Sequence, residues 1–206
     1  MTKIKICGIT NYADAINAAN LGADYLGFNF YKKSPRYIEN AKAGEIINLL
    51  PKRVKKVGVF VNESIKNIKA AADFCGIDLA QLSGDEDAQF ISNLKKMLNK
   101  KIIKSFRVNG KKIIPEKTGN SFFDYILIDS FKKGIYGGTG SKFNWSIIKN
   151  IDKKNLFLAG GLNPLNVKLA IQKVKPYAVD VCSGVELHPR KKDFGKMRKF
   201  IEAVKS

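Results

Sequence analysis

Short apolar runs alternate with longer stretches of helical periodicity along the whole chain. Each run has the length and the β-branched or aromatic composition of a buried strand. Between these runs, apolar residues recur at the three- and four-residue spacing of amphipathic helices. We therefore predict eight strands, at residues 3–9, 25–30, 55–61, 79–84, 101–108, 123–129, 156–161 and 178–184.

Residues typical of helix ends mark the stretches between these strands. Ser64 is suited to begin a helix and Gly76 to end it, and Gly22 is suited to end an earlier one. Pro164 is expected in the first turn of the helix that follows Asn163. The predicted helices span residues 11–22, 40–50, 64–76, 85–99, 163–175 and 193–205, and the weakest helical pattern lies at 111–120.

The alternation of strands and helices predicts an α/β fold with a parallel sheet, because parallel neighbours need a crossover connection. Eight such units in 206 residues average about 26 residues each, which suits a single (β/α)8 TIM barrel of eight parallel strands with outer helices. An open doubly wound sheet is the alternative, but its first strand-to-helix turn would read GxGxxG, and here it reads CGIT. Since no Pro/Ser-rich linker divides the chain, we expect residues 1–206 to form one barrel domain.

The charge balance is strongly basic, with 37 Lys and Arg against 18 Asp and Glu, a net charge of +19. A nucleic-acid-binding protein would need these charges in a stripe, together with aromatic groups for stacking. Only five of them are arginine, and the lysines are spread along the chain. We interpret them as a solvated surface whose field steers anionic substrates inward, and we expect no nucleic-acid partner.

Thiol content and hydropathy indicate the compartment. No apolar run approaches the roughly 20 residues of a membrane-spanning helix, and the N-terminus lacks the apolar stretch of a signal peptide. Cys7, Cys75 and Cys182 are widely spaced without a CxxC pair, and His188 is the sole histidine. That pattern suits neither a disulfide framework nor a structural zinc site. We expect a cytoplasmic protein with reduced thiols, no metal and no membrane partner.

A TIM barrel binds its substrate at the C-terminal ends of its strands. The seventh and eighth predicted strands end in AGGLNP and CSGVE. Small residues at both junctions let backbone N–H groups approach an anion closely. We therefore expect a phosphate group to bind at Gly160, Gly161, Ser183 and Gly184.

Cys7 ends the first predicted strand, where alternation places it on the same face as Lys5, with Ile4 and Ile6 on the other face. Because the outer face of a barrel packs on helices, Cys7 and Lys5 should point into the barrel. The Lys5 ammonium would then lower the pKa of the thiol and favour a thiolate that can act as a general base. Strands 1 and 8 are neighbours in a closed barrel, so we predict Asp180 as the counter-ion of Lys5.

Two further residues at strand ends suit chemistry on a sugar. Asp129 ends the apolar run YILID, where partial desolvation would raise its pKa and let it donate a proton. Arg36, in FYKKSPRYI after the second strand, is a candidate clamp for a carboxylate. The glycine-rich segment 134–145 is either a flexible tether or a lid over the substrate.

The chain resembles the phosphoribosylanthranilate isomerase family from Lys3 to about Asp193, through the segments KICGIT, GFNFYKKSPRYI, VGVFVN, AQLSGDE, LIDS, YGGTGSKFNW, LAGGLNPLNV and AVDVCSGVE. The resemblance implies an aldose–ketose isomerase of tryptophan biosynthesis that acts on a small phosphosugar without a cofactor or metal. Its reaction would be the Amadori rearrangement of N-(5-phosphoribosyl)anthranilate to 1-(o-carboxyphenylamino)-1-deoxyribulose 5-phosphate. It also implies that Cys7 is the general base, Asp129 the general acid, and Arg36 the residue that holds the anthranilate carboxylate.

Two positions depart from the family's pattern, and two questions stay open. The family usually has histidine at the position of Ser83 and glycine at that of Arg190, in a variable loop that includes His188, which we do not expect to be catalytic. The alternative enzyme is the related aminoaldose isomerase of histidine biosynthesis. That chemistry relies on an aspartate ending the first strand, where this chain has Cys7. The sequence does not decide between a monomer and a homodimer.

Overall fold

The computed structural model describes residues 1–108, 122–130 and 152–206. The helix expected at 111–120 and the tether or lid expected at 134–145 lie outside these residues.

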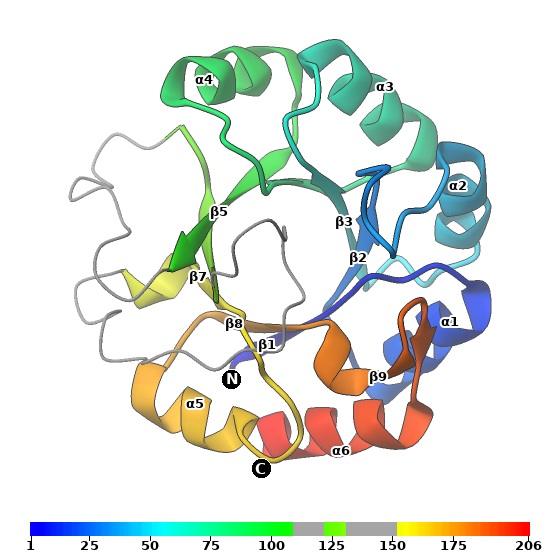
Figure 1. The fold of residues 1–206 in the computed structure, drawn as a ribbon, viewed down its shortest axis with the longest axis vertical. Helices are drawn as coiled ribbons and strands as arrows, with labels where there is room; N and C mark the ends of the chain where they lie inside the picture. The colour runs from blue at the N-terminus through cyan, green and yellow to red at the C-terminus, as the bar shows by residue number, and fades with distance from the viewer. Residues whose placement is uncertain (109–121, 131–151) are drawn as a thin grey trace.

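The described strands form a closed barrel in which eight parallel strands follow one another in chain order and β8 pairs with β1 (Figure 1). Helices lie around the outside of this barrel. The prediction of a TIM barrel is thus confirmed, and the open-sheet alternative is wrong. The strands are β1 Lys3–Cys7, β2 Tyr25–Asn29, β3 Lys55–Phe60, β4 Leu79–Leu82, β5 Lys101–Val108, β6 Tyr125–Ser130, β7 Leu156–Leu158 and β8 Ala178–Val181.

The predicted helix ends agree with the structure where a side-chain or glycine cap fixes them. The Ser64 side chain accepts a hydrogen bond from the backbone N–H of Asn67, and both Gly22 and Gly76 adopt the left-handed conformation that ends a helix. The described helices are α1 Tyr12–Leu21, α2 Asn40–Asn48, α3 Ile65–Cys75, α4 Ala88–Met97, α5 Val167–Val174 and α6 Phe194–Lys205, with a 3-10 turn η2 at Lys153–Asn155.

The expected start of the helix at 163–175 is wrong, because Pro164 precedes α5 rather than lying in its first turn. The Asn166 side chain accepts a hydrogen bond from the backbone N–H of Asn163 and donates one to the carbonyl of Gly161. These local side-chain bonds hold the segment in a turn, and asparagine competes with helical hydrogen bonding in this way. The helix therefore begins only at Val167.

The expected helix at 85–99 also begins later, because Asp87 caps α4 with its side chain. Glu86 lies before the helix and is buried. Its carboxylate accepts backbone N–H bonds and pairs with the buried ammonium of Lys104 at 2.6 Å. The acid at this position thus holds the loop after β4 against β5 rather than complementing the dipole of α4.

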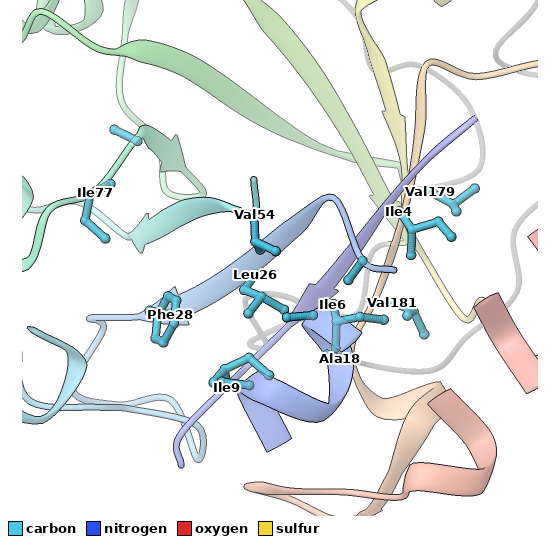
Figure 2. Packing of buried hydrophobic residues seen from close by; sticks show 14 of the residues in the cluster. Ile4, Ile6, Ile9, Ala18, Leu26, Phe28, Val54, Ile77, Val179 and Val181 are labelled. Carbon is cyan, nitrogen blue, oxygen red and sulfur yellow. The ribbon is translucent and has the colours of Figure 1, made fainter. Parts of the chain in front are cut away.

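The barrel wall separates an outer core from an inner one. Ile4 and Ile6 of β1 point outward with Leu26 of β2 and Val179 of β8, where they pack under the helices (Figure 2). This confirms the predicted outer face of β1. The inner core is closed at the N-terminal ends of the strands by four packed rings, with centroids 5.3–5.6 Å apart, from Tyr25, Tyr125, Phe157 and Tyr177. These rings close the end of the barrel opposite its C-terminal mouth.

The segment after β8, expected to be a variable loop, forms a 3-10 turn and an antiparallel hairpin. These are η3 (Ser183–Val185), β9 (Glu186–His188) and β10 (Lys191–Lys192). The hairpin lies beside α1 (Figure 1), and Asp14 of that helix pairs with the Lys191 ammonium at 2.9 Å and accepts the backbone N–H of Lys192 at 2.8 Å.

Arg190 lies at the tip of this hairpin, at the position where the family usually has glycine. Its φ is 76°, in the left-handed region that costs a non-glycine residue about 1–2 kcal/mol. Its guanidinium donates a hydrogen bond to the carbonyl of Tyr37 at 2.8 Å, and its own carbonyl accepts one from Thr10. These contacts tie the hairpin to the loops after β1 and β2.

Candidate active site

Lys5 and Asp180 form an ion pair inside the barrel, as predicted. They are opposite each other in the register of β1 and β8, and the Lys5 ammonium lies 2.9 Å from the Asp180 carboxylate. Burial opposes the charge of Lys5, but Asp180 and Cys7 outweigh it and raise the pKa of the ammonium. Burial also raises the pKa of Asp180, to about 7. The pair places a positive charge directly below Cys7.

Replacing Lys5 with methionine should destabilise the protein by about 3–5 kcal/mol, because it leaves the Asp180 carboxylate buried without its cation. The pKa of Asp180 in the fold lies above its ordinary value of 3.8. The folded state thus holds a proton that the unfolded state has lost, and stability falls as the pH rises above about 4. The loss in Lys5→Met should accordingly be smallest in acid and largest above neutral pH. Urea unfolding measures it.

The double variant Lys5→Met/Asp180→Leu is the matched control, since it removes both charges and should recover much of the stability. If Lys5→Met were as stable as the parent above neutral pH, the Lys5–Asp180 pair would contribute nothing to the free energy of unfolding.

Cys7 and Asp129 both lie at the C-terminal mouth of the barrel, as predicted, and each is only 9% exposed. Cys7 ends β1 and hydrogen-bonds to Lys5. Asp129 lies near the end of β6. The charges of both groups reach Asp180 and favour its protonated form. Asp180 is thus coupled electrostatically to both candidate catalytic groups.

The surroundings of Cys7 favour a thiolate. A hydrogen bond from the Cys182 thiol lowers the pKa of Cys7 most; burial opposes this, but the charges of Lys5 and Lys192 reinforce it, and the pKa falls well below its ordinary value. Gly27 of the neighbouring strand leaves room for the sulfur, because a Cβ at that position would lie 2.6 Å from it. The structure thus provides both the space and the positive field that an ionised thiol needs.

Arg36 reaches the same mouth and is held by a carboxylate that the sequence analysis did not identify. Its guanidinium makes two hydrogen bonds, of 2.8 and 2.6 Å, to Glu186. The fully buried ammonium of Lys192 binds the same carboxylate at 3.0 Å. Burial would raise the pKa of Glu186, but Arg36 and Lys192 outweigh it and lower that pKa. Two of the five guanidinium N–H groups are used here, and the others are left for further acceptors.

Cys182, Glu186 and Lys192 are the residues that the sequence analysis missed at this site. Cys182 and Glu186 belong to the quoted segment AVDVCSGVE, but no role was inferred for either. Lys192 lies in the supposed variable loop, and only the hairpin brings its ammonium within 3.8 Å of the Cys182 sulfur. His188 is exposed on the same hairpin.

The four expected phosphate-binding residues occupy two adjoining loops. Gly160 and Gly161 follow β7 with φ values of 90° and 65°, a conformation that favours glycine. Ser183 and Gly184 form η3 after β8. A Cβ at Gly184 would lie 1.9 Å from the carbonyl oxygen of Leu162, so the loops meet in a contact that only glycine permits.

Ser83, where the family usually has histidine, lies at the rim of β4. Its hydroxyl accepts a hydrogen bond of 3.0 Å from the amide of Gln81, whose Oε1 atom has no partner among the described residues. Ser83 thus holds a buried amide in place.

Two general features of the described residues bear on the kind of protein. No group of three or more His, Cys, Asp or Glu side chains is arranged to hold a metal ion in this part of the chain. None of its helices has the length and apolar character needed to cross a membrane.

Comparison with known proteins agrees with this architecture and identifies the family. A family model described as N-(5'phosphoribosyl)anthranilate (PRA) isomerase matches residues 4–203. The N-(5'-phosphoribosyl)anthranilate isomerase of Aquifex aeolicus is 51% identical, with 100% of both chains covered. Monomers generated from the dimeric phosphoribosylanthranilate isomerase of Thermotoga maritima match with a TM-score of 0.84 and 37% identity, over 100% of this chain and 99% of that one. A phosphoribosyl anthranilate isomerase in complex with reduced 1-(o-carboxyphenylamino)-1-deoxyribulose 5-phosphate matches with a TM-score of 0.84 and 36% identity over the same shares. The chain therefore belongs to the N-(5'-phosphoribosyl)anthranilate isomerase family.

Proposed function

We propose that the protein catalyses the Amadori rearrangement of N-(5-phosphoribosyl)anthranilate to 1-(o-carboxyphenylamino)-1-deoxyribulose 5-phosphate in L-tryptophan biosynthesis. Family membership indicates the reaction. The observation that carries the proposal is a buried thiol with a lowered pKa that shares the mouth of the barrel with a buried carboxyl group. An aldose becomes a ketose by losing a proton from one carbon and gaining one at another position. These two transfers require one general base and one general acid.

Asp129 is the proposed acid and Cys7 the proposed base. Asp129 protonates the ring oxygen of the furanose, so that the ring opens to a Schiff base. The Cys7 thiolate then removes the proton from C2 of the sugar, and the resulting enolamine tautomerises to the ketone. The lowered pKa of Cys7 supports its role, because it increases the fraction of the thiol that is ionised when the substrate arrives.

The phosphate of the substrate is proposed to bind at Gly160, Gly161, Ser183 and Gly184. Contact between the two loops supports this assignment, because it places the glycine-containing backbone of both at one end of the mouth, and such backbone can approach an anion closely. The net charge of +19 adds a favourable long-range field for a substrate that carries a phosphate and a carboxylate.

Arg36 is the proposed partner of the anthranilate carboxylate, and Arg36→Ala should raise KM by about 10- to 100-fold while lowering kcat much less. The loss follows from removal of a charge-assisted, bidentate contact far from the reacting carbons. Steady-state kinetics separates the two constants. Arg36→Lys should restore only part of the affinity, because an ammonium cannot form the planar fork.

Arg198→Ala is the matched control, since Arg198 is exposed on α6 and pairs only loosely with Glu202, at 3.9 Å. Its KM should equal that of the parent. An unchanged KM in Arg36→Ala would contradict the assignment of the carboxylate-binding group.

The activity is tested by following the fluorescence of phosphoribosylanthranilate as purified protein consumes it, with Cys7→Ala as the negative control. The aminoaldose of histidine biosynthesis, assayed in parallel, tests the alternative substrate. Consumption of the second substrate with the higher kcat/KM, or of neither, would overturn the proposal.

We further propose a cytoplasmic location, which three free cysteines support, because reduced thiols suit a reducing compartment. Monomer and homodimer remain the alternative states for this chain, and sedimentation equilibrium of the purified protein distinguishes them.

A further inference from the structure

Cys182 has no part in the proposed proton transfers, yet its thiol lies against the catalytic one. Strands β1 and β8 pair in a register that sets Ile6 opposite Val181, and Cys7 and Cys182 are the residues that directly follow this pair. Neighbouring strands lie about 4.8 Å apart, within the range of about 4.4–6.8 Å between the Cα atoms of a disulfide. The paired strand ends, one residue before each cysteine, thus lie at a spacing that a disulfide can bridge.

The two thiols also interact with each other: Cys182 lowers the pKa of Cys7, and Cys7 raises that of Cys182. The Cys182 thiol lies 4.0 Å from a carboxylate oxygen of Glu186 as well. A Cβ at Gly8, the residue after Cys7, would lie 2.9 Å from the Cys182 sulfur. The sulfur of Cys182 thus lies over the end of β1, next to the residue that follows Cys7.

The two sulfurs differ in chemical character. Cys7 has the lowered pKa of a nucleophilic thiolate, whereas its hydrogen bond with Cys7 and burial raise the pKa of Cys182 and keep that thiol protonated. Cys182 is also the more exposed of the two. Such a pair has the character of an oxidisable thiolate beside a resolving thiol.

We propose that Cys7 and Cys182 are a redox modification site, in which a hydroperoxide converts the two thiols into a reversible disulfide that blocks the isomerase. The Cys7 thiolate attacks a peroxide oxygen, the O–O bond breaks, and Cys7 becomes a sulfenic acid as hydroxide leaves. The Cys182 thiol then attacks that sulfur, the S–S bond forms, and water leaves. With hydrogen peroxide, two thiols lose two electrons and the peroxide is reduced to two molecules of water.

The consequence for turnover rests on the proposed function, because it requires Cys7 to be the catalytic base. A disulfide would remove that base and also protect Cys7 from irreversible oxidation to a sulfinic acid. Return to the dithiol by a thiol reductant would restore the thiolate. The formation of the bond depends only on the position and character of the two sulfurs.

The third cysteine provides the internal control. Cys75 lies in α3, where it is buried, donates a hydrogen bond to the carbonyl of Asn40 at 3.3 Å, and has a pKa raised by burial. It should not react. Cys75→Ser should therefore be oxidised like the parent, with the same loss and recovery of activity.

The test treats the full-length protein with hydrogen peroxide, maps its cysteines by mass spectrometry, and assays it before and after dithiothreitol. We expect a peptide linked through Cys7 and Cys182, together with a loss of activity that the reductant reverses. A sulfinic acid at Cys7 beside a free Cys182 thiol would overturn the proposal. If the disulfide is mapped but the protein does not isomerise phosphoribosylanthranilate, the proposed function is contradicted and the proposed modification site is still supported.

Variants of Cys182 provide a second test. The activity of each variant after oxidation is compared with its own activity before oxidation. In Cys182→Ser and Cys182→Ala, no resolving thiol remains to trap the Cys7 sulfenic acid, so continued exposure to peroxide should convert it to a sulfinic acid that dithiothreitol does not reduce. Recovery like that of the parent after the same prolonged exposure, in either variant, would also overturn the proposal. If neither variant folds, the peptide map of the parent decides the question.

Discussion

Replacing Cys7 with alanine is expected to lower kcat by about 10³-fold or more while leaving the fold intact. A positioned general base contributes about 10²–10⁴-fold to a rate, and the methyl group of alanine cannot accept the proton from C2 of the sugar. Cys7 is only 9% exposed, but its side chain faces the mouth rather than the core under the helices. The substitution should therefore leave the free energy of unfolding close to that of the parent.

The matched control is Cys75→Ala, which removes a buried thiol far from the mouth. Its kcat should stay at the parent level, and any loss should appear in urea unfolding instead, because Cys75 belongs to the outer core. A Cys7→Ala protein with the turnover of the parent would show that another group is the base.

The pH dependence of the parent follows from the same thiol. A base works only when it is unprotonated, so kcat/KM should fall as the pH falls through the pKa of Cys7 and level off above it. Cys182, Lys5 and Lys192 hold that pKa well below its ordinary value of 9.0. We therefore expect the plateau to begin at a lower pH than it would with an ordinary thiol as the base. A profile that still rises steeply through the ordinary pKa of a thiol would contradict the thiolate assignment.

The barrel was predictable from the sequence because its physical requirements are local. Each buried strand is an apolar run, each crossover is an amphipathic helix, and the alternation of the two admits few topologies. Even the Lys5–Asp180 pair follows from alternation along β1 together with closure of the barrel. The starts of α4 and α5 were placed too early because Asp87 and Asn166 bond to nearby backbone groups, which hydrophobic periodicity does not reveal.

The candidate site was predictable from the sequence only for residues that lie at the ends of strands. Cys7 and Asp129 end apolar runs, and their strand positions place them at one mouth. The partner of Arg36 could not be predicted, since Glu186 lies 150 residues away. Lys192, which binds the same carboxylate, lies on a hairpin whose sequence has the pattern of a polar loop. Contacts between distant loops depend on how the chain folds back, and spacing along the sequence does not encode that geometry.

Asp129→Asn is expected to lower kcat by about 10²–10⁴-fold, because the amide keeps the shape of the carboxyl group but cannot deliver its proton. Asp129→Ala should be at least as slow. Asp73→Asn, an exposed change on α3, is the matched control and should leave kcat unaltered.

The double variant Cys7→Ala/Asp129→Asn distinguishes a shared pathway from two independent losses. Asp129 is proposed to open the ring before Cys7 removes the proton, so both groups serve one sequence of steps. Residues that act as a unit have non-additive effects, and the double variant should be little slower than the slower single variant. Fully multiplied losses would mean that the thiol and the carboxyl group act separately, and an Asp129→Asn enzyme with the turnover of the parent would exclude Asp129 as the acid.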